Sequence, residues 1–298
     1  MTDQLDPQLD LELVRELKAP KALLWKCWTD PRHLPHWFVP RPHKVVACEL
    51  DLRPGGACNT TFDVDGALME NNGVYLEVVP GEKLVFTDTY TAGWKPAPEP
   101  FMTAIVTFED LGNGSTRYRA VARHRNSEAA EAHRKMGFFD GWGTVAGQLE
   151  EFAQELDRRA LTITRLIKAP VAKVMRCWTD PAILPRWFGP AGFTCKTKEI
   201  DLREGGVWRF DMEGHGMVFP NRHRYSVMRD GRIEFLMDDD GARTPMEVSV
   251  TMAPEAGGTR LTQTILFPDA EGKVAALGYQ ADLRGQETLA KLAKEAEG

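Results

Sequence analysis

The sequence predicts an α+β protein of two tandem domains, in each of which a curved antiparallel β-sheet wraps around a long carboxy-terminal helix. Three observations predict this fold. A series of short motifs occurs twice, at a constant offset of 150 residues from Pro20 to Pro170. In each copy, short apolar–polar alternations lie between turn signals, as in antiparallel strands. Each copy also ends in a stretch whose apolar residues recur every three to four positions, which is typical of an amphipathic helix.

The repeated unit is long enough to fold by itself. The motif Cys27-Trp28-Thr29-Asp30-Pro31 recurs at residues 177–181, and Asp51-Leu52-Arg53 with the glycine pair that follows recurs at residues 201–206. A repeat of about 150 residues has the size of a globular domain rather than of a solenoid unit. We therefore expect a first domain over residues 1–158 and a second over residues 159–298. Because hardly any linker separates them, we expect the two domains to pack against each other.

Each copy is expected to begin with a strand and two short helices. Residues 9–17 alternate leucine with charged residues, which is the pattern of a half-buried strand. Proline suits the first turn of a helix because the amide it lacks would have no partner there, so Pro20 and Pro170 mark helix starts. Asp30 and Asp180 supply a capping carboxylate for a second short helix.

The rest of each copy is expected to form the sheet and the helix that covers it. In the first copy we place strands near residues 44–52, 56–63, 70–79, 82–90, 101–110 and 115–124, and a long helix from Phe139 to Leu156. Only this helix can cover the apolar face of the sheet, so space left between them would form a pocket. Glycines at 137, 141, 143 and 147 cost about 1 kcal/mol each relative to alanine, which indicates either close helix–sheet contact or room for a ligand.

The composition excludes several classes of function. The chain of 298 residues has a net charge of −6 and no block of basic residues, so we expect neither a nucleic acid nor an anionic membrane surface as a partner. No signal peptide or membrane-spanning run is evident, so a cytoplasmic protein is expected. The five cysteines lack metal-binding spacing and are expected to be reduced core residues. His33, His36 and His43 lack further ligands, so no metal is expected, and no nucleotide motif indicates a cofactor.

The motifs resemble those of a known superfamily. The sequences K-A-P, W-T-D-P, L-x-x-W-F and D-L-R-x-G-G occur in both copies, and Arg209-Phe210-Asp211-Met212 occurs in the second. In this order they resemble the START-like, or helix-grip, superfamily. More narrowly, they resemble the family named after the activator of the 90-kDa heat-shock protein ATPase, in its calicheamicin-resistance-like branch. The resemblance implies the helix-grip fold in each half. Members of the family bind varied ligands, and the family name implies a possible protein partner.

The third strand gives the clearest contrast between the copies. Cys58, Thr60 and Phe62 share one face in the first copy, where the second copy has Trp208, Phe210 and Met212. If this face is the concave one, the first domain leaves a hollow that the second fills with its own side chains. The first domain also has a longer loop over residues 91–100, in which Trp94 on a proline-stiffened segment would suit a lid.

We therefore predict one set of ligand-binding residues for each domain. In the first domain they are Trp37, Phe38, Cys58, Thr60, Phe62, Glu70, Tyr90, Trp94, Phe101, His124, Phe139 and Trp142. In the second, which is expected to be more filled and mainly structural, they are Trp187, Trp208, Phe210, His223 and Tyr279. For some of these residues a structural role is the alternative: the two Trp-Phe pairs could anchor the short helix, and the histidines could be satisfied by their neighbours. No catalytic residue is assigned.

Three functions remain open at this point. The first is cytoplasmic binding or sequestration of a small hydrophobic, aromatic ligand in the first domain, which needs no covalent chemistry. The second is a stress-related or chaperone-associated adaptor that binds another protein. The third is a cyclase-like enzyme that acts by positioning its substrate. A large enclosed apolar volume favours the first and third, whereas a collapsed interior with an exposed apolar patch favours the second.

Overall fold

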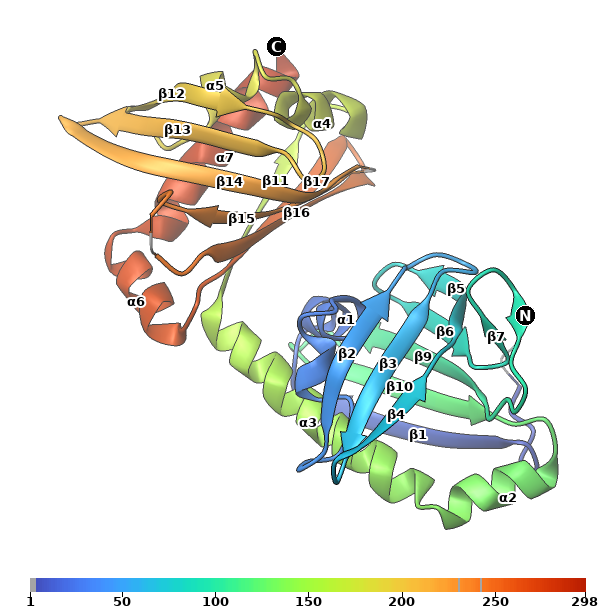
Figure 1. Cartoon of the computed structure of the whole chain (residues 1–298). Coiled ribbons are helices and arrows are strands. Elements are labelled where there is room, and N and C mark those ends of the chain that lie inside the picture. Colours follow the sequence, from blue (N-terminus) through green and yellow to red (C-terminus); the bar gives the residue numbers. More distant parts are fainter. Residues whose placement is uncertain (1–3, 230, 242) are drawn as a thin grey trace. The chain divides into compact units, whose positions relative to one another are not determined.

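The protein was studied as a computed structural model that describes residues 4–229, 231–241 and 243–298 (Figure 1). The chain divides into two compact units, one ending at Asp157 and the other beginning at Arg158. The first unit contains several antiparallel sheets and the second a single one, and each unit ends in a long helix. The α+β fold with two tandem helix-grip domains is therefore confirmed. Among the described residues, no helix is long and apolar enough to cross a membrane.

The first unit opens with the predicted strand and two short helices. These elements are β1 (Asp10–Leu17), α1 (Lys21–Thr29) and the 3-10 helix η1 (Leu34–His36). Pro20 is the N-cap of α1, a position at which its missing amide breaks no helical hydrogen bond. After α1, the Asp30 carboxylate accepts the Arg32 amide at 2.9 Å and so starts the next turn. The Trp37 indole donates to the carbonyl of Cys27 at 3.1 Å, which joins η1 to α1.

The strands of the first unit form two main sheets and a small hairpin. The strands are β2 (Lys44–Leu50), β3 (Cys58–Val64), β4 (Ala67–Asn71), β5 (Val74–Val79), β6 (Lys83–Thr87), β9 (Thr103–Asp110) and β10 (Thr116–Arg123), with the hairpin β7 (Tyr90–Thr91) and β8 (Lys95–Pro96). One sheet has the order β1-β10-β9-β6-β5 and the other β2-β3-β4.

The strand predicted over residues 70–79 is two strands, because the chain breaks at Asn72-Gly73 between β4 and β5. At the break, the carbonyl of Gly73 accepts the Cys58 amide at 2.9 Å and keeps the two sheets joined. A side chain at Gly73 would place its Cβ only 2.5 Å from the carbonyl oxygen of Thr87. The close approach of a neighbouring strand therefore requires glycine at this position.

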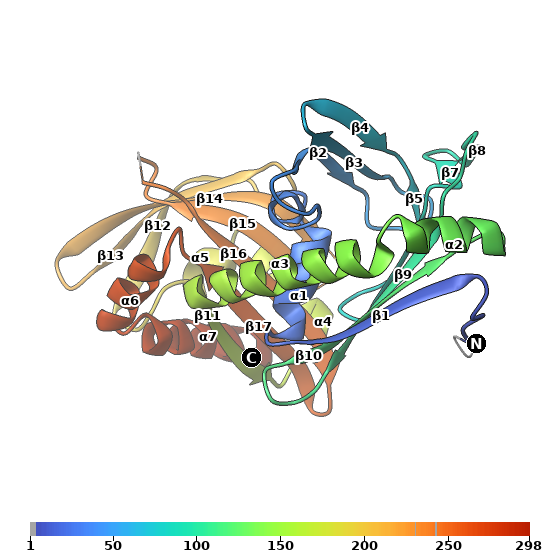
Figure 2. The ribbon, with the colours of Figure 1, turned by 90° about the horizontal axis from the view of Figure 1, so that it is seen from below.

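Two helices close the first unit, α2 (Ser127–Lys135) and α3 (Phe138–Arg159). The sequence predicted only the second. Asn126 caps α2 by accepting the Ala129 amide at 2.9 Å, a capping signal that was missed. Figure 2 shows α3 crossing the unit, with β2, β3 and β4 on one side and β1 and β10 on the other. Its buried face includes Val145, Leu149 and Leu156.

The second unit repeats this order with a continuous sheet. Its elements are β11 (Ala160–Ile167), α4 (Val171–Thr179), α5 (Leu184–Trp187), β12 (Phe193–Ile200), β13 (Val207–Gly214), β14 (Met217–Arg229), β15 (Arg232–Asp238), β16 (Met246–Glu255), β17 (Gly258–Leu266), α6 (Ala270–Gly278) and α7 (Ala281–Glu297). The seven strands have the order β11-β17-β16-β15-β14-β13-β12. The long strand β14 runs unbroken where the first unit has the break between β4 and β5.

Equivalent side chains anchor the long helix in both units. In the first, the Gln148 side chain donates to the carbonyls of Trp37 at 2.9 Å and Val39 at 2.8 Å. In the second, the Lys291 ammonium donates to the carbonyls of Gly189 at 3.0 Å and Phe193 at 3.3 Å. The helix therefore fixes the loop after the second short helix, and that loop forms one end of the interior.

Candidate ligand-binding site

The first unit contains a cavity of about 340 Å³, a volume at the lower end of the range of small-molecule sites. Its walls come from α1, η1, β3, β4, β5, β6, β9, β10 and α3, and from the segments that join them. The lining residues are Trp28, Leu34, Trp37, Phe38, Val39, Pro40, Cys58, Thr60, Phe62, Asn71, Asn72, Gly73, Tyr75, Phe86, Thr87, Asp88, Phe101, Met102, Ala104, Tyr118, Gly141, Trp142 and Val145. Most of this wall is apolar or aromatic.

One wall is the inner face of β3. Cys58, Thr60 and Phe62 all line the cavity, because alternate residues of a strand point to the same face of a sheet. The Tyr75 hydroxyl of the neighbouring strand forms a hydrogen bond with the Cys58 thiol. Small side chains at 58 and 60 leave this part of the wall recessed.

A cluster of aromatic rings forms the end of the cavity beneath the short helices. The ring centroid of Trp28 lies 4.8 Å from that of Trp37 and 5.3 Å from that of Phe38, both in edge-to-face geometry. Phe38 in turn lies 6.0 Å from Phe62, and Trp28 stacks at 6.4 Å on Tyr118. The Trp-Phe pair therefore both anchors the short helix and lines the cavity. The two roles considered for it in the sequence analysis are compatible.

The opposite end of the cavity is more polar and more exposed. Asn71 and Asn72, which are exposed, contribute neutral carboxamide side chains there. The Asp88 carboxylate accepts the backbone amides of Phe101 at 2.8 Å and Met102 at 3.1 Å, and it thereby fixes the segment that carries Phe101. Helix α3 completes this end with Trp142. We take this end as the mouth of the cavity.

The buried titratable groups of the lining are held in their neutral forms. Burial raises the pKa of the Cys58 thiol to about 12, and burial also raises the pKa of the hydroxyls of Tyr75 and Tyr118. These groups therefore remain protonated at neutral pH and can serve as hydrogen-bonding groups. They are not poised to act as bases or nucleophiles.

A pair of histidines lies behind the mouth. His124 donates through Nδ1 to the carbonyl of Leu9 at 2.9 Å, and its Nε2 lies 2.9 Å from Nδ1 of His133. The ring of Phe101 packs on His133 with a centroid distance of 4.7 Å. Burial, with a smaller effect of His124, lowers the pKa of His133 to about 4. The pair therefore supports Phe101 from behind.

The structure brings together seven of the twelve residues predicted for the first domain. Trp37, Phe38, Cys58, Thr60, Phe62, Phe101 and Trp142 line the cavity. Glu70 lies on the exposed strand β4, His124 lies behind Phe101, and Phe139 is 46% exposed at the start of α3. Tyr90 and Trp94 pack on each other at 6.0 Å in the β7–β8 hairpin, where Trp94 covers Gly55 and not the cavity.

Several lining residues escaped the sequence analysis. They are Trp28, Tyr75, Asn71, Asn72, Asp88 and Tyr118. The repeated W-T-D-P motif could have indicated Trp28, since it lies one helical turn from the buried Leu24. The asparagines were missed because Asn71, the last residue of β4, and Asn72 lie where the predicted strand breaks between β4 and β5.

In the second unit, large side chains occupy the equivalent positions. Trp208 and Phe210 replace Cys58 and Thr60, and their rings stack with centroids 3.8 Å apart. Both are at most 1% exposed. His223, which takes the place of Gly73, is also buried, and Phe188 lies 5.2 Å from Trp208.

The other residues predicted for the second domain do not share one site. Trp187 is buried and donates to the Cys177 carbonyl at 2.9 Å. Tyr279, at the end of α6, is 76% exposed and lies away from this cluster.

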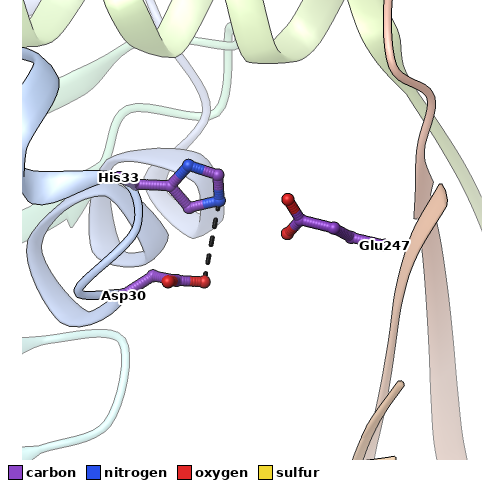
Figure 3. A group of neighbouring side chains, drawn as sticks. All are labelled: Asp30, His33 and Glu247. Atoms are coloured by element: carbon purple, nitrogen blue, oxygen red, sulfur yellow. Dashed lines mark ion pairs between the residues drawn. The ribbon is translucent and has the colours of Figure 1, made fainter. Parts of the chain in front are cut away.

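His33 has a partner on its own loop. Its Nε2 lies 3.6 Å from the Asp30 carboxylate, with which it forms the ion pair drawn in Figure 3. Burial favours a raised pKa for Asp30, but hydrogen bonds from Arg32 and the charge of His33 lower it overall. All five cysteines are free. The absence of a bound metal and of a cofactor stays a prediction.

Comparison with known proteins agrees with the duplicated fold. The profile of the family described as "Activator of Hsp90 ATPase homolog 1-like protein" matches residues 18–154 and again residues 168–297. The chain belongs to this AHSA1-like family. Both AHSA1-like matches fall within single structural units, and the first contains every residue that lines the cavity.

Solved structures match one half or the whole of this AHSA1-like chain. A protein from Nitrosomonas europaea is 39% identical, covers 50% of this chain and 97% of its own, and has a TM-score of 0.49. A protein from Chromobacterium violaceum is 28% identical, covers 45% and 95%, and has a TM-score of 0.40. The di-domain ARO/CYC BexL from the BE-7585A biosynthetic pathway is 15% identical, covers 97% and 99%, and has a TM-score of 0.40. No curated protein gives a significant match.

Proposed function

We propose that the first unit binds a small hydrophobic, aromatic molecule in its cavity and that the second unit is mainly structural. The observation that carries this proposal is the difference between equivalent strands. Cys58 and Thr60 line an open cavity, whereas Trp208 and Phe210 stack on each other in a buried core. The aromatic lining offers edge and face contacts to a planar ligand, which favour an aromatic guest beyond simple burial of apolar area.

Sequestration fits the chemistry of the lining better than catalysis does. The thiol and phenol groups of Cys58, Tyr75 and Tyr118 stay protonated at neutral pH, because burial raises their pKa values. The Asp88 carboxylate is engaged by two backbone amides. Selectivity would therefore come from shape and a few hydrogen bonds, and the expected setting is the cytoplasm. Adaptor and cyclase-like functions are the alternatives, and the test below separates ligand binding in the cavity from the adaptor function.

The first test asks whether the purified protein retains a ligand. Native mass spectrometry of freshly prepared full-length protein should show an added small molecule. The double variant Cys58→Trp/Thr60→Phe installs the side chains of the second unit and should fill the cavity. We expect this variant to lose the added mass and to bind N-methyl dansylamide, a neutral bicyclic probe, at least tenfold more weakly than the wild type.

Thr61→Phe is the matched control, because residue 61 lies on the opposite face of the same strand and pairs with Glu70. It should leave probe binding unchanged. Equal binding by the wild type and by a folded Cys58→Trp/Thr60→Phe variant would contradict a site in this cavity. An apo mass together with no probe binding at all would favour the adaptor function.

A further inference from the structure

One polar group of the cavity wall has no partner in the protein. Tyr118 lines the cavity and is 1% exposed, yet its hydroxyl forms no hydrogen bond with any residue that the structure describes. Burial raises the pKa of this hydroxyl, so it stays protonated and can both donate and accept. A buried hydroxyl without a partner lowers stability, and a molecule in the cavity that supplies the partner recovers this loss.

The second unit has an apolar side chain at the equivalent position. Thr116 and Thr259 are equivalent, since each donates to the backbone carbonyl that directly precedes the proline of its first helix. Two residues further along these strands, Tyr118 corresponds to Leu261, which is fully buried. An apolar side chain therefore suffices for the core of this fold. The hydroxyl occurs in the unit whose cavity it lines, which indicates a role in binding rather than in folding.

The Tyr118 hydroxyl also differs from the other unpartnered polar groups of the interior. The hydroxyl of Tyr225 in the second unit is sealed among protein atoms, whereas part of the Tyr118 hydroxyl stays accessible, and the cavity is the space that this residue lines. The indole N–H of Trp28, which stacks on Tyr118 at 6.4 Å, lacks an acceptor too. Its counterpart Trp178 lacks one as well. The indole by itself therefore does not indicate a ligand, but the tyrosine hydroxyl does.

The charges around the cavity restrict the group that Tyr118 can bind. None of the described lining residues is basic, and Asp88 supplies a carboxylate at the mouth. A carboxylate or phenolate would lose its hydration in this cavity without gaining an opposite charge. A neutral phenolic hydroxyl or ring carbonyl costs less to bury, and it can form a hydrogen bond with the tyrosine.

We propose that the ligand carries a neutral oxygen on its buried ring, as a phenol or a ring ketone does, and that this oxygen forms a hydrogen bond with the Tyr118 hydroxyl. This inference rests on the proposed function and specifies the class of its ligand. The oxygenated edge of the ring system enters first and reaches the end of the cavity where Trp28 stacks on Tyr118. Tyr118 thus distinguishes an oxygenated ring from a hydrocarbon of the same shape.

The test uses pairs of neutral probes of nearly the same shape, titrated by fluorescence against the full-length protein. 2-Naphthol and 2-methylnaphthalene form the pair for a phenol, and 1-tetralone and tetralin form the pair for a ketone. Tyr118→Phe removes the hydroxyl and keeps the ring. We expect it to weaken binding of the oxygenated member by about fivefold in at least one pair, as for one enclosed hydrogen bond. Binding of the hydrocarbons should not weaken, and the pair that responds identifies the oxygen as phenol or ketone.

Tyr225→Phe is the matched control, because it removes a buried, unpartnered hydroxyl from the filled core of the second unit. It should leave the binding of every probe unchanged. Without ligand, both variants should melt at a higher temperature than the wild type, because each loses a buried hydroxyl that has no partner. If Tyr118→Phe weakens both members of each pair equally, or no member at all, the hydrogen bond is refuted and the cavity proposal stands. If the wild type binds none of the probes, both proposals are refuted.

Discussion

His223 is a buried polar side chain without a hydrogen-bonding partner in the described part of the chain. Both of its ring nitrogens and the hydroxyl of Tyr225 lack partners there. The ring lies among aromatic neighbours and stacks on Phe235 at 4.4 Å. Burial lowers the pKa of His223 to about 3, against 6.5 for a free side chain. The His223 side chain therefore fills space in the second unit, but it lowers stability because its buried nitrogens make no hydrogen bond there.

This environment predicts a specific pH dependence. Folded His223 stays neutral down to about pH 3, whereas in the unfolded chain it takes up a proton near pH 6.5. Acidification across this window therefore lowers the free energy of unfolding. His223→Leu should raise the melting temperature at neutral pH and should reduce the loss of stability between pH 6.5 and 3. Thermal unfolding followed across this range measures both effects.

Tyr225→Phe is the matched control for this prediction. It removes the unpartnered hydroxyl beside His223 but no group that titrates in this window, since burial raises the pKa of Tyr225. It should raise the melting temperature by a similar amount at every pH. A pH profile of His223→Leu identical in slope to that of the wild type would refute the assigned role.

At the scale of the element, helix α3 carries glycines that its packing does not require. A Cβ at Gly141 or Gly147 would meet nothing within 4 Å outside the helix itself. Close helix–sheet contact therefore does not explain these two residues. Gly141 lines the cavity, whereas Gly147 is exposed on the same helix and does not. Substitutions at these two positions therefore distinguish an effect on helix propensity from an effect on the volume of the cavity.

The pair gives a prediction with an internal control. Gly141→Ala and Gly147→Ala should each stabilise the protein by up to about 1 kcal/mol, because alanine favours the helix. Only Gly141→Ala adds a methyl group beside the cavity, so only this variant should change the affinity for N-methyl dansylamide. Denaturant unfolding and probe titration of both variants measure the two effects. Altered affinity in Gly147→Ala alone would contradict the placement of the cavity.

The sequence predicts the elements that depend on local patterns. The strand β1 follows from alternation of leucine with charged residues, and α1 follows from Pro20 and the spacing of its apolar residues. Helix α2 was missed because it is short and mostly polar, although Asn126 marked its start. Local sequence patterns thus predict the type of most elements, but they fail to indicate short polar helices.

Features that depend on distant neighbours could not be predicted. The close approach of the Thr87 carbonyl to Gly73 depends on another strand, although the Asn72-Gly73 pair is itself a turn signal that the sequence analysis missed. Trp94 was expected to act as a lid, yet it sits at a positive φ of 60° and covers Gly55. By contrast, β3 alternation correctly placed Cys58, Thr60 and Phe62 on one wall. The side chains most accessible to sequence reasoning are those on regular strands.

At the scale of the whole molecule, the two units share a fold and differ in how they fill it. The loop anchors are equivalent, with Thr116 donating to the Ala19 carbonyl at 2.8 Å and Thr259 donating to the Ala169 carbonyl at 2.7 Å. The interiors differ between β3 and β13, and also at Gly73, whose place is taken by the buried His223 of β14. The large β13 side chains thus fill space that the small β3 side chains leave open, while the loop anchors stay the same in both units.

This view predicts that the second unit can be opened. Trp208→Cys/Phe210→Thr installs the small side chains of the first unit and removes two stacked rings from a buried core. Each loss of a large aromatic side chain costs about 3 kcal/mol or more, so the melting temperature of the variant should fall. If the new space persists, a second equivalent of N-methyl dansylamide should bind and partly restore the stability. Hydrogen exchange should then show ligand protection in β13–β15, which the wild type should show only in strands of the first unit. A variant that loses stability but still binds only one equivalent would have collapsed into the new space, since His223 and Phe188 remain there to fill it. The difference between the units would then depend on more than the two β13 side chains.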